Sequence, residues 1–167
     1  MDMVEALEFC PAHVNLLLVG AGPYREALEA RAQALGKSAQ IRILPNRPLS
    51  ELPQVMNALD ALVLVSRTTP SWKEQFGRVI IEANACQIPV IGSDSGAISE
   101  VIGQAGLVVP ERNPRALSQA ICTLDADPDR RREMGLLGRQ QVEASYTWER
   151  VAERMQAIYC RVMGERN

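Results

Sequence analysis

The sequence predicts an α/β fold, a three-layer sandwich with a mostly parallel sheet of about five strands and a helical C-terminal tail. Short apolar runs alternate with longer segments of helical periodicity, and connections of only a few residues join them. The runs are continuously apolar, as expected for parallel strands that are buried on both faces. With 167 residues, 47% of them hydrophobic, residues 1–167 can form a single domain with one core.

The expected elements follow from these patterns in chain order. Residues 1–9 resemble the end of a helix, and no strand precedes them. We expect strands at 14–20, 41–44, 61–66, 88–93 and 106–110, with helices at 24–35, 50–58, 78–86 and 96–102. In the last third, Asn113-Pro114 and Asp127-Pro128 each place a capping side chain before a proline. Thr147 then caps an amphipathic helix at 147–163, which could cover the sheet or reach a partner.

Charge and composition exclude several classes of function. The net charge of −2 argues against a nucleic-acid partner, which needs an excess of clustered positive charge. No apolar run approaches the ~20 residues that span a bilayer. The four cysteines show no metal-ligand spacing, so we expect no metal site and interpret them as reduced core thiols of a cytoplasmic protein.

A glycine turn follows the first predicted strand. Gly20 and Gly22 would let a ligand approach the backbone at the start of a helix, where phosphate groups bind well. The dinucleotide fingerprint fails, because its third glycine position holds Arg25 and no acid ends the next strand. The turn alone is compatible with a ligand contact and with a purely structural role.

Residues 71–96 carry the strongest chemical signal. Glu74 and Glu82 stand eight positions apart, and Phe76-Gly77 between them begins a helix. Because helical side chains lean towards the N-terminus, Glu82 should point back towards the loop that carries Glu74. The carboxylates would then flank the unpaired N–H groups of Phe76, Gly77 and Arg78.

Two interpretations of this arrangement remain open. The carboxylates could simply stabilise the helix dipole from its first turns. Alternatively, the helix start could bind the phosphates of a sugar nucleotide while each carboxylate accepts hydrogen bonds from sugar hydroxyls.

The segment "PSWKEQFGRVIIEANACQIPVIGSDSGAISEVI" resembles the donor-binding segment of the group 1 (family four) retaining glycosyltransferases. The resemblance continues through "LLLVGAGPYREALEARAQALG" upstream and through "GLVVPERNPRALSQAI" to "YTWERVAERM" downstream. It implies the C-terminal, Rossmann-like half of a GT-B enzyme. Such enzymes transfer a sugar from a nucleotide donor without a bound metal, commonly in polysaccharide or glycolipid biosynthesis. The resemblance also implies a cytoplasmic location and, by analogy, peripheral attachment to the inner membrane surface.

By matching position, the resemblance implies roles for individual residues. Glu74 would hold donor-sugar hydroxyls near the reacting carbon, and Glu82 would bind the ribose. The remaining expected contacts are the backbone of Phe76, Gly77 and Arg78 at the diphosphate or sugar, Gly20 and Gly22 beside the nucleotide, and Leu44 and Pro45 near the base. The turn from Ser93 to Gly96 could be a ligand contact or purely structural.

Several departures from the family pattern lead to further expectations. Gln87 replaces a glycine in a left-handed helix cap, at a cost of about 1 kcal/mol, and Asn84 replaces an apolar residue. The acceptor domain, the first strand and a phosphate-gripping Arg and Lys have no counterpart, so we expect a gap in the sheet. With only Arg78, Lys73 and helix dipoles to offset the glutamates, the chain alone should bind a donor weakly, if at all, and should not turn it over.

Three functions therefore remain as hypotheses. The chain could be the donor-binding part of a retaining glycosyltransferase, either truncated at its N-terminus or paired with a separate acceptor-domain chain. It could be a non-catalytic module that binds a nucleotide or sugar phosphate. It could instead recruit a partner, or self-associate, through the incomplete sheet and the last helix.

Overall fold

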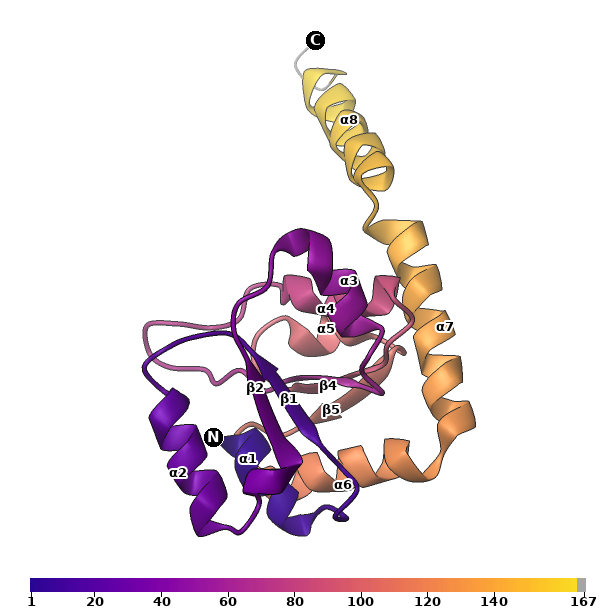
Figure 1. The fold of residues 1–167 in the computed structure, drawn as a ribbon. Helices are drawn as coiled ribbons and strands as arrows, with labels where there is room; N and C mark the ends of the chain where they lie inside the picture. The colour runs from indigo at the N-terminus through magenta and orange to yellow at the C-terminus, as the bar shows by residue number, and fades with distance from the viewer. Residues whose placement is uncertain (165–167) are drawn as a thin grey trace.

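A computed structural model describes residues 1–164, and its five strands form two parallel sheets (Figure 1). In the first sheet, β1 (Leu16–Val19) pairs with β2 (Ile41–Leu44). In the second, β3 (Leu62–Leu64) pairs with β4 (Val90–Ser93), which pairs with β5 (Gly106–Val109). All five predicted strands are confirmed, four of them with shorter bounds. Residues 165–167 of the expected domain lie outside the described part.

The helices also lie where the periodicity predicts them. They are α1 (Asp2–Ala6), α2 (Arg25–Ala34), α3 (Leu52–Met56), α4 (Arg78–Ala85), α5 (Ile98–Ile102), α6 (Pro114–Ala126), α7 (Pro128–Ser145) and α8 (Trp148–Gly164). Both predicted proline caps are confirmed. The side chain of Asn113 accepts a hydrogen bond from the amide of Ala116 at 3.0 Å, and that of Asp127 accepts one from Arg130 at 2.9 Å.

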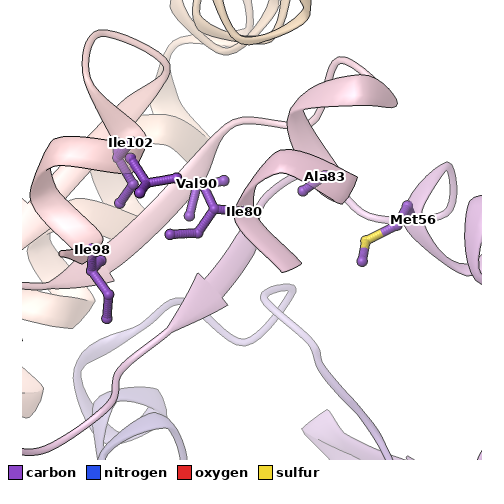
Figure 2. Close-up of a cluster of buried hydrophobic side chains, with 7 residues drawn as sticks. Met56, Ile80, Ala83, Val90, Ile98 and Ile102 are labelled. Atoms are coloured by element: carbon purple, nitrogen blue, oxygen red, sulfur yellow. The ribbon is translucent and has the colours of Figure 1, made fainter. Parts of the chain in front are cut away.

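Helices cover both faces of the three-stranded sheet, which gives the predicted three layers. Successive residues of a strand point to opposite faces. Val90 of β4 belongs to the core under α3, α4 and α5, part of which Figure 2 shows. Its neighbour Ile91 belongs to a second core, formed with α1, α6 and Val109 of β5.

The expectation that all strands are buried on both faces holds only for β4. Every residue of β4 is buried, whereas β1, β2 and β3 contain no fully buried residue. Val19 at the end of β1 is 37% exposed. The physical reason is that, among the residues that the structure describes, β4 is the one strand with a partner on each side, whereas every other strand has an unpaired edge.

A break in strand pairing separates the two sheets, as the family resemblance implies. β1 pairs only with β2, and β3 pairs only with β4, in the part of the chain that the structure describes. The carboxyl ends of the strands therefore form two groups, and loops from each group could contribute to a ligand site.

Helix α8 extends away from the rest of the domain (Figure 1). Its apolar residues are exposed, including Trp148 at 85% and Tyr159 at 57%. Of the two possibilities that the sequence left open, covering the sheet is therefore wrong for this structure. None of the helices within residues 1–164 is both long and apolar enough to cross a membrane.

All four cysteines are free thiols, but they are not all in the core. Cys10 is buried, and desolvation by burial, followed by the neighbouring Cys122, raises its pKa to about 11. Cys160 lies on α8 and is exposed, so the expectation of core thiols is wrong there. The sequence pattern of α8 indicates an apolar stripe but cannot say whether anything covers it.

Candidate functional site

Glu74 lies in the loop between β3 and α4, and three hydrogen bonds hold it. Its carboxylate accepts from the amide of Gly77 at 3.1 Å and from the hydroxyl of Ser66 at 3.2 Å. Its backbone carbonyl accepts from the amide of Ala97 at 3.1 Å. These partners come from the start of α4, the end of β3 and the turn before α5, so Glu74 is anchored to three elements at once.

Gly77 explains why the helix begins between the two glutamates. It is the N-cap of α4 and has φ 74° and ψ 57°, a left-handed conformation that glycine adopts at no steric cost. A Cβ atom at this position would lie 2.8 Å from Cδ1 of Ile80. Its neighbour Phe76 is 39% exposed and packs edge-on against Tyr146, with ring centroids 5.7 Å apart.

One expectation about the start of α4 needs correction. The amide of Gly77 is not free, because it donates to the carboxylate of Glu74. Sequence spacing identifies amides without a helical partner, but it cannot show that a side chain three residues earlier folds back onto one of them. The helix-stabilising interpretation is therefore realised for Glu74 in this conformation.

Glu82 points towards the start of the same helix, as helical geometry predicts. Its Oε1 lies 3.0 Å from Nε of Arg78, one turn earlier, and its side chain is 33% exposed. The Arg78 side chain is 75% exposed. Both carboxylates thus lie beside the first turn of α4, Glu74 at the amide of Gly77 and Glu82 at the side chain of Arg78.

The turn after β4 supports the loop that carries Glu74. The hydroxyl of Ser93 donates to the carbonyl of Ser66 at 2.7 Å. A Cβ atom at Gly96, where φ is +61°, would lie 1.9 Å from the carbonyl oxygen of Glu74. Only glycine lets the two backbones approach this closely, so this turn has a structural role in placing Glu74.

A further group of polar contacts, which sequence reasoning missed, joins the same loops. Glu111, after β5, accepts from the amide of Thr68 at 2.8 Å and from its hydroxyl at 2.6 Å. The hydroxyl of Thr68 also lies 2.9 Å from that of Ser95. The hydrogen bonds from the Thr68 hydroxyl and then its amide lower the pKa of Glu111. Thr68, Ser95 and Glu111 follow β3, β4 and β5, and loops after parallel strands meet at one edge of a sheet. This position in the sequence is the signal that could have identified them.

The other predicted site residues lie at the carboxyl ends of the two strands β1 and β2. The amide of Gly20 donates to the carbonyl of Leu44 at 3.0 Å, so the glycine turn and the Leu44-Pro45 segment are adjacent. Gly22 has open space where a side chain would project. No hydrogen bond or ion pair within residues 1–164 joins this group to Glu74 or Glu82, so the predicted site residues form two separate groups.

A broad hollow lies beside Glu74. It is lined by the loop from Thr68 to Gln75 and, opposite, by Gly96, Ala97 and Glu100. Within the described residues, no group of three or more His, Cys, Asp or Glu side chains is placed to hold a metal ion. The side chains that line this hollow include the hydroxyls of Thr68, Thr69 and Ser71, the carboxylates of Glu74 and Glu100, the ammonium group of Lys73 and the indole of Trp72.

Comparisons with known proteins agree with this architecture. Residues 3–141 match the family described as "Glycosyl transferases group 1". A GDP-mannose-dependent monoacylated alpha-(1-6)-phosphatidylinositol monomannoside mannosyltransferase from Corynebacterium glutamicum is 36% identical over 147 residues, which are 86% of this chain and 38% of the relative. The chain thus spans about two fifths of the length of that relative.

Two solved structures have the same fold. Sucrose-phosphate synthase from Thermosynechococcus elongatus superimposes with a TM-score of 0.80 and is 30% identical, covering 98% of this chain and 43% of the synthase. An Anabaena protein solved in complex with UDP-glucose has a TM-score of 0.79 at 24% identity and covers 93% of this chain and 44% of its own. Both show that the arrangement of strands and helices is one that GT-B proteins share.

Proposed function

We propose that this chain, which belongs to the glycosyl transferases group 1 family, binds the nucleotide-sugar donor as the C-terminal half of a retaining glycosyltransferase. One observation carries the proposal: Glu74 and Glu82 flank the first turn of α4 at the carboxyl end of a parallel sheet. Ligands of open α/β sheets bind at that edge. The relatives named above act on GDP-mannose or bind UDP-glucose, which are donors of the proposed class.

Each part of the site has a role in this proposal. Glu82 accepts hydrogen bonds from the ribose hydroxyls, and Glu74 does the same for the donor sugar. The start of α4, at Arg78, faces the diphosphate, which the partial positive charge of a helix N-terminus favours. The backbone of Phe76 and Gly77 lies beside the donor, and the amide of Gly77 becomes available when a sugar hydroxyl takes its place on Glu74.

The second group of residues completes the nucleotide site. Gly20 and Gly22 border the nucleotide, and Leu44 and Pro45 lie near the base. The adjacency of Gly20 and Leu44 supports this placement, because one ligand group can reach both. The donor then spans the two groups of strand ends, with its sugar at Glu74. No metal takes part in this proposal.

The proposal includes weak binding and no turnover by the chain alone. Glu74 and Glu82 repel a diphosphate, and Arg78 is already paired with Glu82. Transfer also needs an acceptor site, which a separate acceptor-domain chain would supply. The unpaired edges of β1 and β3 support such a partner, or self-association, as the means of completing the sheet. The location that fits this role is the cytoplasm, with peripheral attachment to the inner membrane surface.

Isothermal titration calorimetry with UDP-glucose and GDP-mannose tests the proposal. We expect one of the two donors to bind weakly, with a dissociation constant above about 10 µM. Glu82→Ala should weaken binding about tenfold, since it removes a charged hydrogen-bond acceptor. Glu143→Ala is the matched control, because Glu143 also pairs with an arginine four residues earlier but lies on α7.

Two results would contradict the proposal. Glu82→Ala and Glu143→Ala could have the same affinity as the wild type, which would place the donor elsewhere. The isolated chain could also transfer sugar at a measurable rate, which would show that the residues present suffice for catalysis.

A further inference from the structure

Arg67 and Asp2 form an ion pair unlike the others in the structure. The carboxylate of Asp2 accepts from Nε of Arg67 at 3.1 Å and also from Nη2, so the guanidinium is held at two points. The Asp2 side chain is only 6% exposed, whereas the Arg67 side chain is 45% exposed. In every other ion pair within residues 1–164 the carboxylate is at least 28% exposed.

The backbone of Arg67 lies between two anchored neighbours. Ser66 donates to Glu74 and accepts from Ser93, and Thr68 is held by Glu111. The guanidinium therefore projects from a loop that is anchored on both sides, at the carboxyl end of β3. With both the loop and the guanidinium held, little freedom remains for Arg67 to lose when a ligand binds.

Several carboxylates lie near the loop that carries Arg67. Glu74, Glu111 and Asp94 all face the same loops, and Arg78 is paired with Glu82. The buried Asp2 carboxylate lies on the inner side of Arg67, so the exposed part of the pair is its positive end. Nη1 of Arg67 makes no hydrogen bond within residues 1–164, which leaves its two N–H groups for an outside acceptor.

We propose that Arg67 binds a phosphoryl group of the donor's diphosphate, and that Asp2 is the positioning residue that holds the guanidinium for it. This inference rests on the proposed function, and it adds a cation to the site that the local sequence pattern did not indicate. A guanidinium presents its N–H donors in a rigid fork that matches phosphate oxygens, and the buried carboxylate fixes the fork in advance.

Binding of UDP and GDP, compared with uridine and guanosine, tests the inference in the 167-residue chain. Arg67→Gln should weaken binding of the preferred diphosphate about tenfold, because a charged hydrogen bond is lost, and leave nucleoside binding within about twofold. Asp2→Asn keeps Arg67 but weakens the two hydrogen bonds that orient its guanidinium. We therefore expect a smaller loss of affinity than in Arg67→Gln, and for the diphosphate only. Arg132→Gln on α7 is the matched control and should change neither affinity, since Arg132 is exposed and, among residues 1–164, forms an ion pair with Asp129 alone.

An NMR measurement covers the case in which Arg67→Gln does not fold. Because Asp2 holds the Nε–H of Arg67, this group should give a resolved signal, assigned by its loss in Arg67→Lys. The preferred diphosphate should shift the signal in the wild-type chain, and its nucleoside should not.

Each contrary outcome has a distinct meaning. An unchanged Nε–H signal, or unchanged diphosphate affinity in folded Arg67→Gln, overturns the role of Arg67 alone. If Arg67→Gln weakens the binding of the diphosphate and of the nucleoside equally, the proposed role of Arg67 is wrong and its ion pair with Asp2 is structural. If the wild-type chain binds neither UDP nor GDP, the proposed function fails and this inference fails with it.

Discussion

Replacing Gly77 by alanine should destabilise the domain and disturb the candidate site together. Gly77 has φ 74° and ψ 57°, which an L-residue adopts at a cost of about 1–2 kcal/mol. Alanine would recover about 0.4–1 kcal/mol of this by reducing the freedom of the unfolded chain. The added Cβ would also lie 2.8 Å from Cδ1 of Ile80 and 3.1 Å from Cδ2 of Leu64.

Both contact atoms are the ends of side chains in the core, so they can move only if the core repacks. Overpacking of this kind typically costs about 1–3 kcal/mol. The net expectation is a loss of about 2 kcal/mol in the free energy of unfolding, or about 4–8 °C in Tm for a chain of this size. The bond from the Gly77 amide to Glu74 should weaken too, because relief of strain moves that amide.

Thermal unfolding followed by circular dichroism measures the loss, and urea unfolding gives its free energy. Gln87→Gly is the counterpart, because Gln87 has φ 60° in the cap after α4, the left-handed conformation that the family resemblance implies there. Its side chain is exposed, and glycine there should raise the free energy of unfolding by about 1 kcal/mol. If Gly77→Ala is neutral, or if both variants shift Tm in the same direction, the argument from left-handed backbone is wrong.

Three further predictions concern other parts of the molecule. Asn84 is fully buried, and the nitrogen and oxygen of its side-chain amide have no hydrogen-bond partner within residues 1–164. Asn84→Leu should therefore raise the free energy of unfolding, measured in urea, by about 1–3 kcal/mol, and a decrease would contradict this. The lowered pKa of Glu111 means that its bonds to Thr68 stabilise the loop above the ordinary value of 4.5 and are lost as pH falls below it. An NMR titration of the Thr68 amide should show that transition, and Glu111→Gln should abolish it. Burial raises the pKa of Cys10 to about 11, so iodoacetamide should modify Cys160 before Cys10 in the folded protein and both at similar rates in denaturant.

Local signals predicted the elements of the fold well. The helix that begins after Phe76-Gly77 follows from the backbone freedom of glycine at that position, whereas the left-handed cap at Gln87 follows from the family resemblance, in which a glycine stands there. The break between the two sheets also agrees with the expected gap. Strand burial was predicted less well, because an apolar run indicates what a strand could bury and says nothing about how many neighbours it has.

The candidate site could be predicted only in part from the sequence. The spacing of Glu74 and Glu82 identified the start of α4, yet it did not reveal that Glu74 itself occupies the Gly77 amide. Arg67 was missed altogether, because the buried carboxylate that holds it belongs to Asp2, 65 residues earlier in the chain.

The sequence by itself determined which segments form strands and helices and where α4 begins, since these depend on patterns within about twenty residues. It also determined which family the chain resembles, through several such motifs along the chain. The tertiary structure alone decided which hydrogen bonds hold the loops around Glu74, which N–H groups remain open to a ligand, and which arginine is held in place. Those outcomes depend on distances between residues far apart in the chain, and a local pattern contains no information about such distances.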